Sequence, residues 1–213
     1  MSISAKPLFR AMKRRSPATD TRDPLDYDPT PPDATAAFLA AELAAIMAHG
    51  NEVWEPAVGA GHMARVMEAH GLRVAGSDVV DRGWPGAIVR SFYDFTAAPA
   101  QTQITNPPYC EINARDGAGR WLHHALSFRP KYLAMLLSSD WAAARINGFD
   151  AMFRDHPPSV EYLCCWKIDF RGLGSPPQRN SWFVWDVSRP PVGPDAWVRR
   201  RLYRDKRQAE LFS

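Results

Sequence analysis

The strongest constraint on the fold is the alternation of short apolar runs with helix-length segments. Strands are expected at residues 51–55, 72–78, 87–92, 103–106 and 132–138, and helices at 30–50, 62–70, 119–128 and 140–154. Thr30 precedes two prolines and an acid, and it is expected to cap the first helix. Strands that alternate with helices form a parallel sheet with right-handed crossovers. The nearly continuous apolar run at 132–138 is typical of a buried parallel strand. The sequence therefore predicts an α/β fold with a doubly wound, mostly parallel sheet.

The end of the chain departs from this alternation. Strands are expected at residues 160–170 and 182–187, but the loop between them is too short for a crossover helix. Two such strands pair as an antiparallel hairpin. Neither an internal repeat nor a second domain is visible, and 213 residues suffice for one domain with its own core.

Composition narrows the class of protein. Hydrophobic residues make up 46% of the chain and charged residues 23%, which is ordinary for a soluble globular protein. No apolar run approaches the roughly 20 residues of a membrane span, so no membrane association is expected. Cys110, Cys164 and Cys165 have neither zinc spacing nor the pattern of a disulfide framework. We therefore expect no metal site and a reducing, cytoplasmic setting.

A glycine-rich turn follows the first expected strand. The turn begins at Glu55, continues through Pro56 and Ala57, and holds two glycines, Gly59 and Gly61. Ligands of open α/β sheets bind beyond the carboxyl ends of the strands. Glycines there let the backbone approach a ligand closely. The segment predicts a nucleotide-like cofactor.

Acidic residues after the next two strands support the same site. Asp78 ends the second strand, where a carboxylate can accept hydrogen bonds from both ribose hydroxyls. Asp94 and Phe95 follow the third strand. We expect Asp94 to accept a hydrogen bond from an adenine amino group and Phe95 to pack on the ring.

The tetrapeptide Asn106-Pro107-Pro108-Tyr109 ends the fourth strand and predicts the chemistry. An exocyclic amino nitrogen is a poor nucleophile, because its lone pair is delocalised into the ring. The side-chain oxygen of Asn106 and the carbonyl of Pro107 can accept its two hydrogens and stabilise the developing positive charge. Consecutive prolines fix the direction of the carbonyls. The ring of Tyr109 can stack on a base flipped out of a duplex.

The order of these motifs resembles the class I S-adenosylmethionine-dependent methyltransferases. It is most similar to N6-adenine DNA methyltransferases whose cofactor motif precedes Asn-Pro-Pro-Tyr. The resemblance covers about residues 27–187 and implies a Rossmann-like sheet of seven strands with the last strand antiparallel. It also implies S-adenosylmethionine as cofactor. Thr30 and Pro31 resemble the motif that binds the methionine end of the cofactor. The resemblance also implies that Asn106 contacts the cofactor.

The resemblance also assigns an aromatic segment to the substrate. Residues 181–185 resemble the segment that packs on the other face of the flipped base. Trp182 and Phe183 are neighbours in a strand and face opposite sides, so only one of them can meet the base. Arg179 and Asn180 precede them and can contact phosphate or base. The expected organisation is a basic, proline-rich segment at 1–29, a methyltransferase domain at 30–190 and a basic tail at 191–213.

Adenine in DNA is the expected acceptor, but alternatives stay open. Residues 1–22 and 197–207 are rich in lysine and arginine, which fits either phosphate contacts or solvated tails. Large family members carry a target-recognition domain that has no counterpart after Val187, so a protein partner for target recognition is one possibility. The others are RNA adenine, a protein glutamine amide, and a non-catalytic nucleic-acid-binding subunit. The Glu55-Pro56 pair and the start at Thr30 favour a nucleic-acid base over glutamine.

Overall fold

The computed structural model describes residues 27–112, 119–143, 149–174, 176 and 178–204. Its strands are β1 Glu52–Glu55, β2 Arg73–Asp78, β3 Ile88–Val89, β4 Thr102–Thr105, β5 Tyr132–Ser138, β6 Val160–Cys164, β7 Asn180–Asp186 and β8 Val198–Leu202. Its helices are α1 Pro32–Ala48, α2 His62–Ala69, α3 Tyr109–Ile112, α4 Arg120–Ser127 and α5 Phe149–Asp155, with 3₁₀ turns η1 Phe92–Asp94 and η2 Ser139–Ala143.

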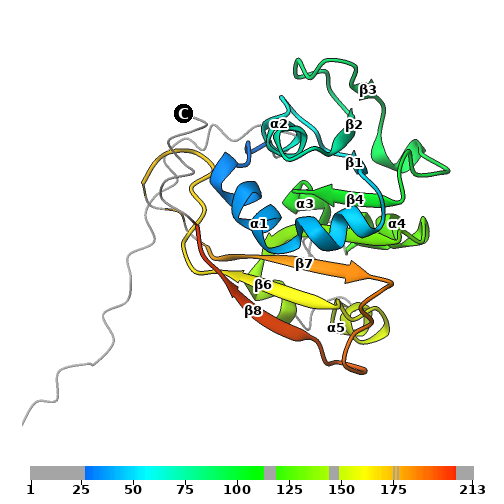
Figure 1. Ribbon diagram of the computed structural model, residues 1–213, viewed down its shortest axis with the longest axis vertical. Helices are drawn as coiled ribbons and strands as arrows, with labels where there is room; N and C mark the ends of the chain where they lie inside the picture. Colours follow the sequence, from blue (N-terminus) through cyan, green and yellow to red (C-terminus); the bar gives the residue numbers. More distant parts are fainter. Residues whose placement is uncertain (1–26, 113–118, 144–148, 175, 177, 205–213) are drawn as a thin grey trace, which may run out of the picture.

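The strands form one sheet in the order β3-β2-β1-β4-β5-β7-β6-β8 (Figure 1). Every neighbouring pair is parallel except the two that involve β7, which runs against β5 and β6. The predicted α/β architecture, its mostly parallel sheet and the antiparallel hairpin are thereby confirmed.

The sheet has an eighth strand where a basic tail was expected. β8 pairs in parallel with β6, and Arg199 lies opposite Glu161 in the register. The Nε of Arg199 donates to Oε2 of Glu161 at 2.9 Å, and the Glu161 side chain is fully buried. A buried carboxylate needs a paired cation. The arginine-rich segment is therefore held as an edge strand, although its arginine side chains stay exposed.

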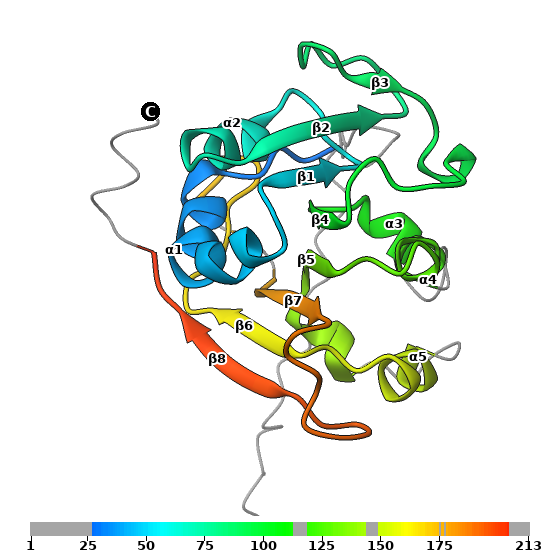
Figure 2. The same cartoon turned by 45° about the vertical axis from the view of Figure 1, so that its right-hand side comes forward.

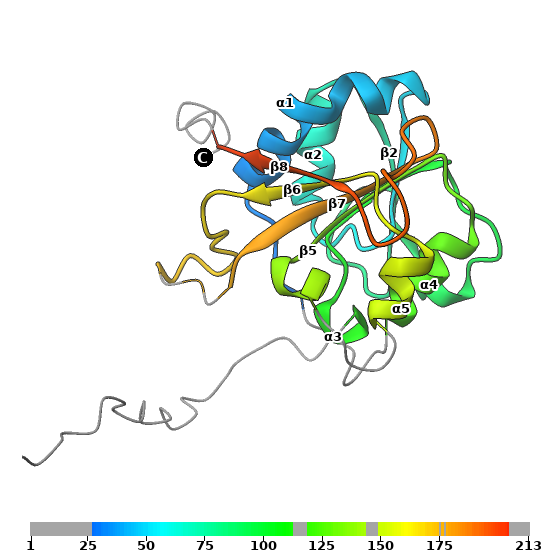
Figure 3. The same cartoon turned by 90° about the horizontal axis from the view of Figure 1, so that it is seen from below.

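Helices cover both faces of the sheet. Figure 3 shows α1 and α2 on one side and α3, α4 and α5 on the other. All seven residues of β5 are buried, and they alternate between the two cores. Tyr132, Ala134 and Leu136 pack with α1 and α2, whereas Leu133 and Met135 pack with α4 and α5. The period of two in a strand explains why this central strand reads as a continuous apolar run.

Several elements are shorter than the sequence predicted. The strand expected at 160–170 ends at Cys164, and the one expected at 87–92 is reduced to β3 followed by η1. The helix expected at 140–154 is observed as η2 and α5, while residues 144–148 lie outside the described residues. In the part of the chain that the structure describes, no helix has the length and apolar character to cross a bilayer.

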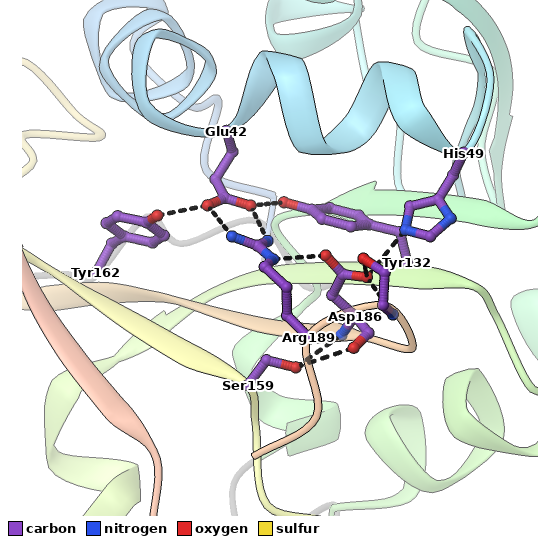
Figure 4. A network of polar contacts seen from close by, with 8 residues as sticks. Glu42, His49, Tyr132, Ser159, Tyr162, Asp186 and Arg189 are labelled. Carbon is purple, nitrogen blue, oxygen red and sulfur yellow. Dashed lines mark hydrogen bonds and ion pairs between the residues drawn. The ribbon is translucent and has the colours of Figure 1, made fainter. Parts of the chain in front are cut away.

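A buried polar network ties α1 to the amino edge of the sheet (Figure 4). Glu42 accepts hydrogen bonds from the hydroxyls of Tyr132 (2.7 Å) and Tyr162, and from both terminal nitrogens of Arg189. The Nε of Arg189 also donates to Asp186 at 2.6 Å. The network joins elements that are distant in the sequence and helps to fix α1 on the sheet.

Candidate functional site

The candidate site lies at the carboxyl edge of the sheet, opposite the Glu42 network. Glu55 and Asp78 end β1 and β2, which lie side by side in Figure 2, and Asn106 directly follows β4. Because these strands are parallel neighbours, their ends meet at the edge where open α/β sheets bind ligands. The topology therefore brings together three residues that were predicted from separate motifs.

The glycine-rich turn is bonded to the end of β2. The N–H of Gly59 donates to Oδ2 of Asp78 at 2.9 Å, and the N–H of Val80 donates to Oδ1 at 3.1 Å. Gly59 and Gly61 have φ values of +54° and +81°, in the region that favours glycine, and Gly61 precedes the first residue of α2. Each carboxylate oxygen of Asp78 keeps a lone pair for a second hydrogen bond, such as one from a ribose hydroxyl.

Tyr27 covers this turn and was not predicted as a site residue. A Cβ on Gly59 would lie 2.5 Å from Cε2 of the Tyr27 ring, so any other residue there would force the ring to move. The Tyr27 hydroxyl accepts a hydrogen bond from the N–H of Ala60 at 3.3 Å, and the guanidinium of Arg82 lies 4.1 Å from the ring centroid. Only the proximity of Tyr27 to Thr30 in the sequence could have indicated this position.

Glu55 is a buried acid without a counter-charge in the described chain. Glu55 is 2% exposed, and its Oε2 has no hydrogen-bond partner among the described residues. Burial raises its pKa well above the ordinary range, and the negative charge of Asp78 raises it further. A cationic ligand group beside Glu55 would reverse this effect. The residue therefore fits the amino and sulfonium cations of S-adenosylmethionine.

Asn106 and Thr30 are in direct contact. Nδ2 of Asn106 donates to Oγ1 of Thr30 at 3.0 Å, although the residues are 76 positions apart. Oδ1 of Asn106 is buried and has no partner among the described residues. The bond to Thr30 turns the amide so that its oxygen remains available as an acceptor.

This contact corrects the role expected of Thr30 at the start of α1. The sequence predicted Thr30 as the helix cap, but α1 begins at Pro32 with Pro31 in the N-cap position and no side-chain cap. The Thr30 side chain is buried and engaged with Asn106 instead.

The remaining residues of the tetrapeptide and of the glycine-rich turn also lie at the carboxyl edge of the sheet. Pro107 is buried and Pro108 half-buried, and the half-buried Tyr109 begins α3. The turn after β1 contains the buried Pro56 and the half-buried Ala57.

Asp94 and Phe95 are less well explained as cofactor ligands. Asp94 is exposed at the end of η1. Phe95 is 7% exposed, and its ring packs on Trp54 with centroids 4.9 Å apart. Among the described residues, neither side chain makes a recorded hydrogen bond or ring contact to Asp78, Asn106 or the glycine-rich turn. Phe95 serves the core here, and its adenine contact stays a prediction.

The structure corrects the expectation for the aromatic segment of β7. Trp182 and Phe183 are both 0% exposed. Trp182 stacks on Phe38 of α1 at 4.2 Å, and Phe183 packs against Phe153 of α5 at 5.6 Å on the other face. Because both faces of β7 are covered by helices, neither ring is open to a base. Arg179, just before β7, is exposed and remains accessible to a ligand.

Solved structures share this fold at low sequence identity. One is a proposed class I S-adenosylmethionine-dependent methyltransferase from Listeria monocytogenes, at 14% identity and a TM-score of 0.55, with 81% of this chain and 65% of that chain covered. Another is a proposed RNA methyltransferase from Pyrococcus horikoshii, at 16% identity and a TM-score of 0.58, with 75% and 87% covered.

A third is the methyltransferase subunit of a type I restriction-modification system from Streptococcus thermophilus. It matches at 12% identity and a TM-score of 0.57, with 88% of this chain and 52% of that chain covered. This chain thus spans less than two thirds of the Listeria protein and about half of the Streptococcus subunit. No protein-family model matches the sequence, and a search of curated proteins returns no significant match. These likenesses show that the chain has the class I methyltransferase fold.

Proposed function

We propose that the protein transfers a methyl group from S-adenosylmethionine to the exocyclic N6 amino group of a flipped-out adenine in DNA. The observation that carries the proposal is the state of Asn106. Its amide nitrogen is held by Thr30 at 3.0 Å, while its buried oxygen lacks a partner among the described residues. A buried polar atom left unpaired costs about 1–3 kcal/mol. An amino group that donates to this oxygen would remove that cost.

On the cofactor side, acidic and backbone groups are already gathered. Glu55 would offset the positive charge of the cofactor, and Asp78 would accept hydrogen bonds from its ribose. The turn at Gly59 and Gly61 would let the backbone approach, with Thr30 near the methionine end. S-adenosylmethionine supplies an activated methyl carbon and a neutral thioether leaving group.

On the acceptor side, the chain must make a weak nucleophile reactive. Asn106 Oδ1 and the Pro107 carbonyl would accept hydrogen bonds from the two N–H groups of the amino group, which localises the lone pair on nitrogen. With S-adenosylmethionine bound, this nitrogen would receive the methyl group, and the electron pair of the broken carbon–sulfur bond would stay on sulfur. The extra proton leaves the nitrogen afterwards for solvent. Preorganised acceptors at the nascent cation are the main contribution of the protein.

Basic residues near the carboxyl edge support a nucleic acid as substrate. Arg179 precedes β7, and β8 exposes Arg200 and Arg201. Phosphate contacts by such residues release counterions and strengthen binding. Arg199 and Arg204 contribute less, because they already pair with Glu161 at 2.9 Å and with Asp33 at 3.1 Å.

Target choice stays open within the proposal. A type I modification subunit is about twice as long as the region this chain matches in it. We therefore propose that sequence recognition rests on the loops at the carboxyl edge or on a protein partner.

The test uses S-adenosylmethionine labelled on its methyl group and separate pools of unmodified DNA, RNA and protein. After digestion, mass analysis should find N6-methyladenine in the DNA, and the Asn106→Ala variant should give almost none. Label confined to RNA adenine or to a glutamine amide would identify a different acceptor. No transfer to any pool would leave the protein as a binding subunit and contradict the proposal.

A further inference from the structure

The tyrosine of the Asn-Pro-Pro-Tyr segment is held by a residue 71 positions later in the chain. Nδ2 of Asn180 donates to the Tyr109 hydroxyl at 2.8 Å. Asn180 is the first residue of β7 and pairs in register with Ser138, the last residue of β5. Because β7 runs against β5, its first residue lies at the carboxyl edge, beside the candidate site.

The other half of the Asn180 side chain is unpaired. Asn180 is 0% exposed, and its Oδ1 has no hydrogen-bond partner among the described residues. A buried amide with one unpaired atom destabilises the fold compared with an apolar side chain of similar size. Within the described residues, the recorded side-chain bond of Asn180 is the one to Tyr109. Asn180 is therefore better explained by what it does to Tyr109 than by stability.

Neighbouring rings restrict Tyr109 further. Trp141 of η2 stands at 70° to the Tyr109 ring, with centroids 5.0 Å apart. Phe170, in the loop after β6, stands at 81° and 6.4 Å. Two edge-on rings limit how far Tyr109 can tilt, and the bond from Asn180 fixes the position of its hydroxyl. The ring is thus oriented before any substrate arrives.

We propose that Asn180 is a positioning residue, which acts through the Tyr109 hydroxyl to hold the ring in the orientation that captures the planar acceptor. The inference rests on the proposed function. It gives Asn180, which the sequence indicated only as a contact to phosphate or base, a role that acts through Tyr109. It also gives the tyrosine hydroxyl a role that stacking alone does not require.

A double-mutant cycle tests this coupling. Asn180→Leu, Tyr109→Phe and the double variant are compared with wild type on amplified, unmodified double-stranded DNA with labelled S-adenosylmethionine. Each single variant should lose about three- to tenfold in kcat/KM, the range for one hydrogen bond, mainly through a higher KM for DNA. Because both variants remove the same bond, the double variant should lose less than the product of the two single losses. Cofactor affinity by calorimetry should be unchanged.

Controls keep the outcomes separate. Ser139→Ala removes a neighbouring hydrogen bond, to Ser181 Oγ at 2.8 Å, and should leave the KM for DNA unchanged. Asn180→Ser provides a second variant for the cycle if the leucine variant does not fold. Multiplicative losses in the double variant, or full activity of the Asn180 variants, would overturn the inference while the proposed function stands. A wild type that methylates no pool would overturn the proposed function and the inference together.

Discussion

Two buried polar clusters lie at opposite edges of the same sheet and differ in one respect. At the amino edge, the carboxylate of Glu42 is surrounded by donors from Tyr132, Tyr162 and Arg189. At the carboxyl edge, Glu55 and Asn106 each keep a buried oxygen without a partner among the described residues. The chain satisfies the first cluster by itself and leaves the second incomplete.

The pKa values of the two glutamates express this difference. Burial raises the pKa of Glu42, but hydrogen bonds from Arg189, Tyr162 and Tyr132 outweigh burial and hold it below the ordinary value. Burial raises the pKa of Glu55, and Asp78 adds to the shift rather than opposing it. The network in Figure 4 is therefore organised for stability, whereas the carboxyl edge is organised for a ligand that carries positive charge and N–H donors.

The largest expected effect is the loss of methyl transfer in Asn106→Ala. Removal of one preorganised transition-state partner typically costs 10²–10³-fold in rate, so we expect a loss of about two or more orders of magnitude. Cofactor affinity should change little, since most expected contacts come from Glu55, Asp78 and the glycine-rich turn. Single-turnover assays and calorimetry measure the two quantities. Substantial single-turnover activity would contradict the central role of Asn106.

A matching change in the other cluster should reduce stability and leave activity intact. Glu42→Gln removes the buried charge that pairs with Arg189. The Arg189 side chain is 37% exposed and keeps Asp186 as a partner, so we expect a loss of about 1–3 kcal/mol, below that of a fully buried pair. Urea unfolding measures this difference. The control is Glu52→Gln, because the Glu52–Arg73 pair has side chains that are 69% and 68% exposed and should contribute less than about 1 kcal/mol. Equal losses of unfolding free energy in the two variants would show that the Glu42 network stabilises the fold no more than an exposed ion pair does.

Much of the fold could be predicted because it rests on local patterns. The strand and helix periods fix the order of elements, and parallel strands must place Glu55, Asp78 and the residue after β4 at one edge. The contact between Thr30 and Asn106 could not be read from a cap pattern, because the threonine hydroxyl serves a partner 76 positions away.

The failures of prediction share a non-local cause. An alternating strand pattern does not reveal that both faces of β7 are covered, so Trp182 and Phe183 were assigned to a substrate although both are buried. The segment of β8 has too many arginines to be predicted as a strand, and its state depends on Glu161, 38 positions before Arg199. Asn180 carries no motif, and its contact with Tyr109 follows only from the antiparallel register.

A smaller effect is expected at the ribose position. Asp78→Ala should weaken binding of S-adenosylmethionine and of its demethylated product to a similar degree, because the ribose is common to both. Hydrogen bonds to a charged acceptor contribute about 1.5–3 kcal/mol, which corresponds to roughly ten- to hundredfold in Kd. Asp78→Asn is the matched control, since it keeps one acceptor oxygen and should lose less. Calorimetry that gives equal affinities for wild type and Asp78→Ala would rule out the ribose assignment.

The smallest effect, and the sharpest test of the comparison, concerns the pH dependence of Glu55. A group with a raised pKa in the folded state contributes stability that is fully present below its unfolded pKa and is lost as pH rises through the folded pKa. Wild type should therefore lose stability over that window, relative to Glu55→Gln, whose amide does not titrate. The affinity for the cofactor should depend on pH in the opposite direction from stability. A cation favours ionised Glu55, so binding releases a proton and affinity rises with pH until Glu55 is ionised in the free protein. The variant should be at least as stable as wild type at neutral pH, bind the cofactor more weakly, and show little pH dependence in this range. Calorimetry in buffers of different ionisation enthalpy measures the released proton directly. If wild type and variant release the same number of protons, the unpaired carboxyl at the carboxyl edge is not where the cation binds, and the contrast between the two glutamates would be one of packing alone.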